Sequence, residues 1–184
     1  MLRGLLLATM LVYDTPTAHT RETSGVVHDS TRQFPRVEGA NLEGRRFSLP
    51  ADFESEYNVV LVAFRREQQV DVETWLPFLR AQRLAERGIR VYELPTLNRS
   101  YRMVRRFIDG GMARGIPDKA TREVTITLYI DKSPFKKALE IATEGRICAL
   151  VVARDGRVLW RADGRFTEAI GSELAATLDS LKGR

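Results

Sequence analysis

The most restrictive feature of the sequence is the run NVVLVAF at residues 58–64, which has no polar side chain after its first residue. A strand with one face in water would alternate polar and apolar residues, so an unbroken run predicts a strand covered on both faces. A polar corner, RREQQ at residues 65–69, and an amphipathic helical pattern follow it. The sequence therefore predicts an α/β domain whose central sheet has helices packed against it.

The remaining segments alternate between strand and helix patterns. We expect a hairpin over 41–50 that turns at Glu43-Gly44 and a final hairpin over 148–164 that turns at Asp155-Gly156. This order predicts a mixed sheet flanked by helices, in one domain over residues 34–184. The other expected strands lie over 89–95 and 123–131. The first helix is expected over 71–87, with Asp71 as its N-cap, Pro77 inside it and Gly88 at its end. Further helices are expected over 100–110, over 133–141 with Ser133 as cap, and from Thr167 onward.

The first 33 residues differ in character from the rest of the chain. An apolar run from Leu5 to Val12 is too short to span a bilayer, but it suits the apolar region of a signal peptide. Residues 14–33 are polar and read as a linker. We expect a signal or anchor that makes the protein exported or membrane-associated, with a frayed or partner-bound terminus in the cytoplasm as the alternative.

Cysteine and histidine usage excludes several kinds of catalysis. Cys148 is the only cysteine, and the two histidines, His19 and His28, both precede the domain. An intrachain disulfide, a CxxC pair and a cysteine-rich zinc site are therefore excluded, and the domain has no imidazole for a catalytic triad. No phosphate loop, dinucleotide fingerprint or calcium loop occurs, and Asp52, Glu54 and Glu56 are expected to be solvated. We predict neither a cofactor nor a metal.

The order of elements, with NLEGRRFSLP ahead of the first core strand and LVVARDGRVLWRADG before the last helix, resembles the thioredoxin fold. It looks most like the redoxin and peroxiredoxin branch, with VTITLYIDKSPFKKALEI as the inserted strand-helix pair. The resemblance places a reactive cysteine in the corner after Phe64 and a cis-proline near Ile147, and neither residue type is present there. It therefore implies a binding protein without thiol chemistry. The rival hypothesis is an atypical oxidoreductase or peroxidase that uses Cys148, although that residue is expected to be a buried thiol.

A narrower resemblance rests on FPRVEGANLEGRRFSLP, VLVAFRREQQVDVETWLPFL and GRVLWRADGRFTEAI. These segments look like the ATPase complex subunit 10 family of mitochondrial ATP synthase assembly factors and its bacterial relatives. The resemblance implies an accessory or assembly subunit of a membrane-associated complex, with a protein partner.

The corner itself is the first candidate site. It lies after a central strand and before a helix, where open α/β sheets form ligand crevices. We predict a polar recognition site in which arginines bind a carboxylate or a phosphate; the alternative is that these side chains only satisfy the backbone of the turn. The predicted residues are Arg65, Arg66, Glu67 and Gln69.

The second candidate is a basic segment. Residues 99–122 hold seven basic and two acidic residues, a surplus equal to the whole formal charge of +5. Helical spacing places its arginines opposite Met103, Val104 and Phe107, so they form either a docking surface for an acidic protein or anionic lipid, or a solvated face. Nucleic acid is disfavoured, since no recognition motif is present. The predicted residues are Arg99, Arg102, Arg105 and Arg106, followed by GGMARGIPD at 110–118, a lid or a plain connector.

Overall fold

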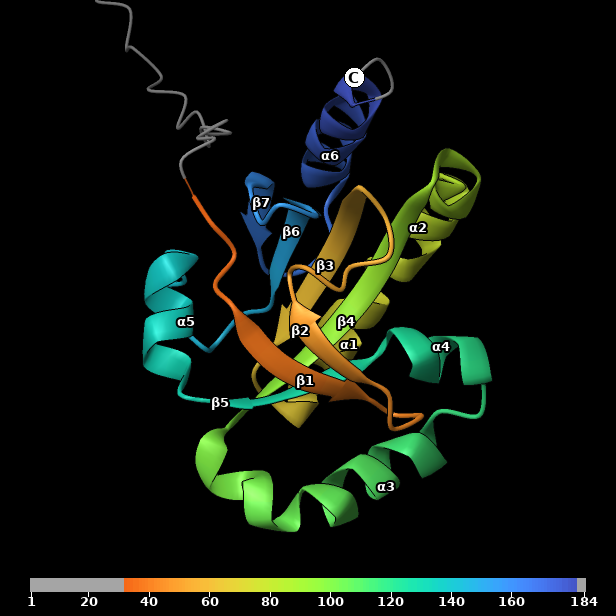
Figure 1. The fold of residues 1–184 in the computed structure, drawn as a ribbon. Coiled ribbons are helices and arrows are strands. Elements are labelled where there is room, and N and C mark those ends of the chain that lie inside the picture. Colours follow the sequence, from red (N-terminus) through yellow and green to blue (C-terminus); the bar gives the residue numbers. More distant parts are fainter. Residues whose placement is uncertain (1–31, 182–184) are drawn as a thin grey trace, which may run out of the picture.

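The computed structural model describes residues 32–181, so the predicted N-terminal signal or anchor lies outside the described part of the chain. Seven strands form one mixed sheet in the order β2-β1-β5-β4-β3-β6-β7, in which β3, β4 and β5 run parallel and the other pairs are antiparallel (Figure 1). The strands are β1 (Val37–Asn41), β2 (Arg46–Leu49), β3 (Tyr57–Ala63), β4 (Ile89–Asn98), β5 (Ile126–Ile130), β6 (Cys148–Ala153) and β7 (Val158–Asp163).

The apolar run forms β3, which is covered on both faces as predicted. Val60 and Val62 pack into one hydrophobic cluster, whereas Val59 and Leu61 pack into a second cluster on the opposite face. Helix α5 contributes to the first cluster, and α1, α2 and α6 contribute to the second. These helices are α1 (Gln69–Glu73), α2 (Leu76–Ala81), α5 (Lys132–Ala138) and α6 (Glu168–Ser180).

The segment expected as one helix over 71–87 is broken into α1, α2 and η2 (Leu84–Arg87). Helix α1 starts at Gln69, after a short turn η1 (Arg66–Gln68), so Asp71 is not the N-cap. Pro77 lies in the first turn of α2, where its missing N–H has no intrahelical partner to lose. Gly88 ends η2 in the left-handed region with φ of 67°, as predicted.

Local turn and cap signals gave correct predictions at several other points. The two hairpins turn through Gly44 and Gly156, whose φ values are 88° and 94°. Thr167 caps α6 by accepting a hydrogen bond from the Ile170 amide. Helix α5 instead begins after Asp131, whose carboxylate accepts from the Ser133 amide, so Ser133 is not the cap.

The largest correction concerns residues 99–124. The expected helix over 100–110 continues past Gly110 and Gly111 as η3 (Arg99–Val104) and α3 (Arg105–Gly115), so most of the expected lid or connector at 110–118 is helical. Helix α4 (Lys119–Val124) follows, and it includes residues 123 and 124, which were expected to begin a strand. Helix α3 stops where Ile116 precedes Pro117, because a residue before proline is biased to extended backbone; its φ and ψ are −116° and 94°. Residues 99–115, named the arch below, project from one end of the sheet (Figure 1).

Candidate functional site

The corner after β3 is held by Gln68, a residue that the sequence-based prediction omitted. Its side-chain oxygen accepts hydrogen bonds from the amides of Phe64 at 2.7 Å and Arg65 at 3.1 Å, and its side-chain nitrogen donates to the Glu144 carbonyl at 2.9 Å. Gln68 is 4% exposed. A glutamine three residues after the N-cap Arg65 is the part of a capping box that could have identified it.

The four predicted corner residues lie on the surface around this buried glutamine. Arg65, Arg66, Glu67 and Gln69 are all exposed, and none forms an ion pair with another residue between 32 and 181. The Gln69 side chain hydrogen-bonds Glu93, whose pKa is raised, chiefly by burial. The backbone of the turn is thus satisfied by Gln68, and the two arginines remain available to a ligand.

The segment before β6 faces this corner and is itself fixed. Glu144 pairs with Lys132 at 2.5 Å and with Lys136 at 2.9 Å, and hydrogen bonds from these two lysines lower the pKa of Glu144. Ile147 directly precedes β6, so no proline occupies the position where the redoxin resemblance places one.

Cys148 is the first residue of β6 and is fully buried, as predicted. Burial raises the pKa of its thiol to about 12. The thiolate is the nucleophilic form of cysteine, so a pKa this high leaves very little reactive sulfur near neutral pH.

Four arginines of the arch line a groove of about 1080 Å³ between the arch and strands β1, β2 and β5. The sequence-based prediction omitted Arg36 and Arg46, which reach the same groove from the N-terminal hairpin region. No local pattern links them to the arch, since the sheet pairing β1 with β5 brings the two segments together. The arginine groove is therefore lined by Arg36, Arg46, Arg99, Arg102, Arg105 and Arg106.

The charges of the arginine groove are not compensated within the described chain. None of its six arginines is within ion-pair distance of a carboxylate in residues 32–181. The acidic lining residues have uncharged hydrogen-bond donors instead. These donors are the Ser48 hydroxyl to Glu38 at 2.7 Å, the Tyr129 hydroxyl to Asp109 at 2.8 Å and the Ser133 amide to Asp131 at 3.0 Å. The groove therefore has a positive potential that favours anions.

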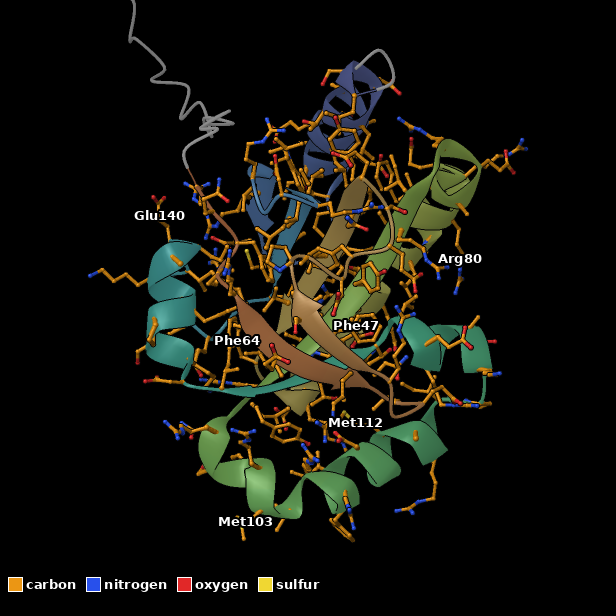
Figure 2. The ribbon with its side chains drawn as sticks, in the orientation of Figure 1. Phe47, Phe64, Arg80, Met103, Met112 and Glu140 are labelled. Carbon is orange, nitrogen blue, oxygen red and sulfur yellow. The ribbon has the colours of Figure 1, made fainter. Side chains whose placement is uncertain are left out.

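The arch is attached at its middle and at its far end. At its middle, Asp109 accepts the hydrogen bond from the Tyr129 hydroxyl, and burial raises the pKa of Tyr129. At its far end, the Arg122 guanidinium donates to the carbonyls of Ile116 at 2.8 Å and Pro117 at 2.7 Å. Between these attachments α3 contains no buried residue. Figure 2 shows Met112 on the side of the arch that faces the sheet and Met103 on the side that faces away, with nitrogen-bearing side chains in the space between arch and sheet.

Asp52, Glu54 and Glu56 before β3 are exposed, as expected, and Glu54 is engaged with arginines. Glu54 pairs with Arg90 and, at 2.5 Å, with Arg45, and these contacts lower its pKa. Within residues 32–181 no three histidine, cysteine or acidic side chains gather as a metal site would require. No helix in that range has both the length and the apolar character needed to cross a membrane.

Comparison with solved structures identifies the fold. The chain is similar to a thiol:disulfide interchange protein from Bacteroides sp. (19% identity, 83% of this chain and 89% of that one, TM-score 0.51). It is also similar to BsSco, described as a member of the Sco family of cytochrome c oxidase assembly proteins (13% identity, 84% of this chain and 96% of that one, TM-score 0.54). A third similar structure is the exposed lipoprotein thioredoxin Etrx1 of Streptococcus pneumoniae (11% identity, 80% of this chain and 100% of that one, TM-score 0.53).

The sequence matches no protein-family model and no curated protein. At the identities above, structural similarity defines the fold and not the activity. The chain therefore has a thioredoxin-like fold, a mixed sheet flanked by helices with a strand-helix pair, β5 and α5, ahead of the final hairpin.

Proposed function

We propose that the protein is a non-catalytic thioredoxin-like binding protein, an accessory or assembly subunit of a membrane-associated complex. The observation that carries this proposal is the arginine groove, in which six guanidinium groups lie without a carboxylate partner in the described chain. An acidic segment of a partner protein would supply the missing carboxylates, since guanidinium groups bind carboxylates through paired hydrogen bonds.

The state of the thiol supports a binding role over catalysis. The lone Cys148 is buried with a raised pKa, and the corner that would present a nucleophile holds Gln68 and Gln69 instead. A protein with the same fold is described as an assembly protein for cytochrome c oxidase, so this scaffold is compatible with an assembly role. The resemblance to the ATPase complex subunit 10 family makes the ATP synthase the first complex to examine.

Co-purification from native membranes solubilised in detergent tests the proposal. The tagged full chain should retain an acidic protein partner, and Arg102→Glu/Arg105→Glu should lower its capture about tenfold or more, because like charges then meet in the groove. Added salt should weaken the wild-type complex.

Two matched double reversals locate the binding surface. Arg65→Glu/Arg66→Glu changes the net charge equally at the corner. Arg80→Glu/Arg83→Glu does so at the end of α2, where Figure 2 places Arg80, and in the turn before η2. We expect neither to reduce capture. If only the corner variant loses partner capture, the partner binds at the corner and not in the groove. If all three variants lose capture equally, overall charge alone is responsible for binding.

The rival function, a thiol oxidoreductase or peroxidase that uses Cys148, has its own test. Disulfide reduction and peroxide consumption are measured for the wild type and Cys148→Ser. We expect equal, negligible rates, and a wild-type rate that Cys148→Ser abolishes would replace the binding hypothesis with catalysis.

A further inference from the structure

The arch carries a cluster of exposed apolar side chains that do not line the arginine groove. Five large apolar residues are exposed within residues 32–181, and four of them lie in one stretch of seven residues. The outer apolar face consists of Tyr101 (51% exposed), Met103 (94%), Val104 (51%) and Phe107 (81%), whereas the fifth residue, Val70 (58%), lies in α1.

This clustering is not expected of an ordinary solvated helix. Exposing apolar surface is unfavourable, and contiguous apolar patches on a monomer usually mark an interaction site. No part of the described chain covers this one, since η3 and α3 contain no buried residue. The arch is also at an end of the molecule, where it can meet a flat surface (Figure 1).

The charge of the same segment indicates what kind of surface these apolar residues would contact. Between residues 99 and 108 there are four arginines and no acidic residue. A helical segment that combines exposed phenylalanine and methionine with arginines resembles the helices that lie in the interface of a membrane. Long arginine side chains can extend from the helix flanks to lipid phosphates while the apolar side chains insert more deeply.

We propose that the outer apolar face of the arch inserts into the surface of a bilayer that contains anionic lipids. A bilayer accepts a protruding side chain such as Met103 without a complementary pocket, which a protein partner would need to provide. A second copy of the chain fits less well, because a two-fold contact through this face would bring two sets of arch arginines together. The inference goes beyond the proposed function, because its four apolar residues do not line the arginine groove, although the arch arginines serve both contacts.

A tryptophan reporter in the full chain tests the insertion locally. Trp75 and Trp160 are 0% and 1% exposed, so Phe107→Trp adds an indole in a solvated position. Its emission should shift to shorter wavelength with phosphatidylcholine vesicles that contain phosphatidylserine, and far less with pure phosphatidylcholine. Val70→Trp is the matched control on an exposed apolar residue outside the arch, and its emission should not shift.

Sedimentation with the same vesicles measures the contribution of the face. Met103→Ser/Phe107→Ser should lower the partition coefficient about tenfold or more, whereas Val70→Ser should leave it unchanged. The first 31 residues are identical in all variants, so their own contribution to vesicle binding cancels from the comparison.

Three results would overturn the inference. They are no spectral shift at residue 107 with anionic vesicles, an equal shift at residue 70, and a concentration-dependent dimer that Met103→Ser/Phe107→Ser abolishes, which would assign the face to a second copy. Capture of the protein partner in detergent measures binding at the groove in the absence of a bilayer. Failure of the membrane contact and failure of the proposed function therefore give different results.

Discussion

The corner and the arch follow neighbouring parallel strands, β3 and β4, yet they are built in opposite ways. The corner leads into helices whose side chains fill a core cluster, and Gln68 satisfies its turn. The arch buries no residue, keeps its arginines unpaired within the described chain and exposes Met103 and Phe107. The redoxin resemblance places a reactive cysteine after β3. In this chain the exposed apolar cluster and the four arch arginines of the groove follow β4 instead.

The largest expected difference between the two regions is in packing. Trp75 is fully buried, stacks edge-on against Trp160 and Phe166, and donates to the Gly164 carbonyl at 3.1 Å. Trp75→Ala should lower the free energy of unfolding by about 3–5 kcal/mol in urea titrations, because it leaves a cavity and an unpaired carbonyl. A loss under about 1 kcal/mol would show that the corner helices are as loosely held as the arch.

The second test removes the hydrogen bonds that close the corner. Gln68→Ala leaves the Phe64 and Arg65 amides without their acceptor, and should cost about 2–3 kcal/mol in urea unfolding. The neighbouring Glu67→Ala is the control, since that side chain is exposed and forms no ion pair within residues 32–181, and it should cost about 0.5 kcal/mol or less. Equal effects would mean that the turn is held by its backbone alone.

The third test uses pH. The lowered pKa of Glu144 in the folded state means that its ion pairs stabilise the fold above the unfolded pKa of about 4.3, and that this contribution is lost as pH falls through the folded value. Glu144→Gln should therefore cost about 1 kcal/mol at pH 7, with the difference from the wild type shrinking towards about pH 3.

Glu123, which forms an exposed pair with Lys119 at 3.7 Å, provides the control for this comparison. Glu123→Gln should change the free energy of unfolding little at any pH. A Glu144→Gln effect that does not vary with pH would contradict the role assigned to its charge.

Sequence reasoning succeeded where the determinants are local. The apolar run of β3, the turn at Gly156 and the cap at Thr167 each depend on residues within one element, and their predictions are correct. Sequence reasoning failed where the contacting residues are far apart in the chain. The side-chain nitrogen of Gln68 donates to the carbonyl of Glu144, 76 residues away, and Arg36 lines the groove because β1 pairs with β5. Periodicity placed the arginines opposite the apolar residues, but it could not say that the apolar side would be exposed.

The smallest expected effect on stability completes the comparison. Met103→Ser/Phe107→Ser changes two large apolar side chains that are 94% and 81% exposed, so the free energy of unfolding should change by no more than about 0.5 kcal/mol. A loss above about 1.5 kcal/mol in urea titration would mean that another part of the chain covers this face. A neutral result makes the same variant a clean probe for vesicle binding, because any loss of partitioning then reflects the missing side chains and not a weakened fold.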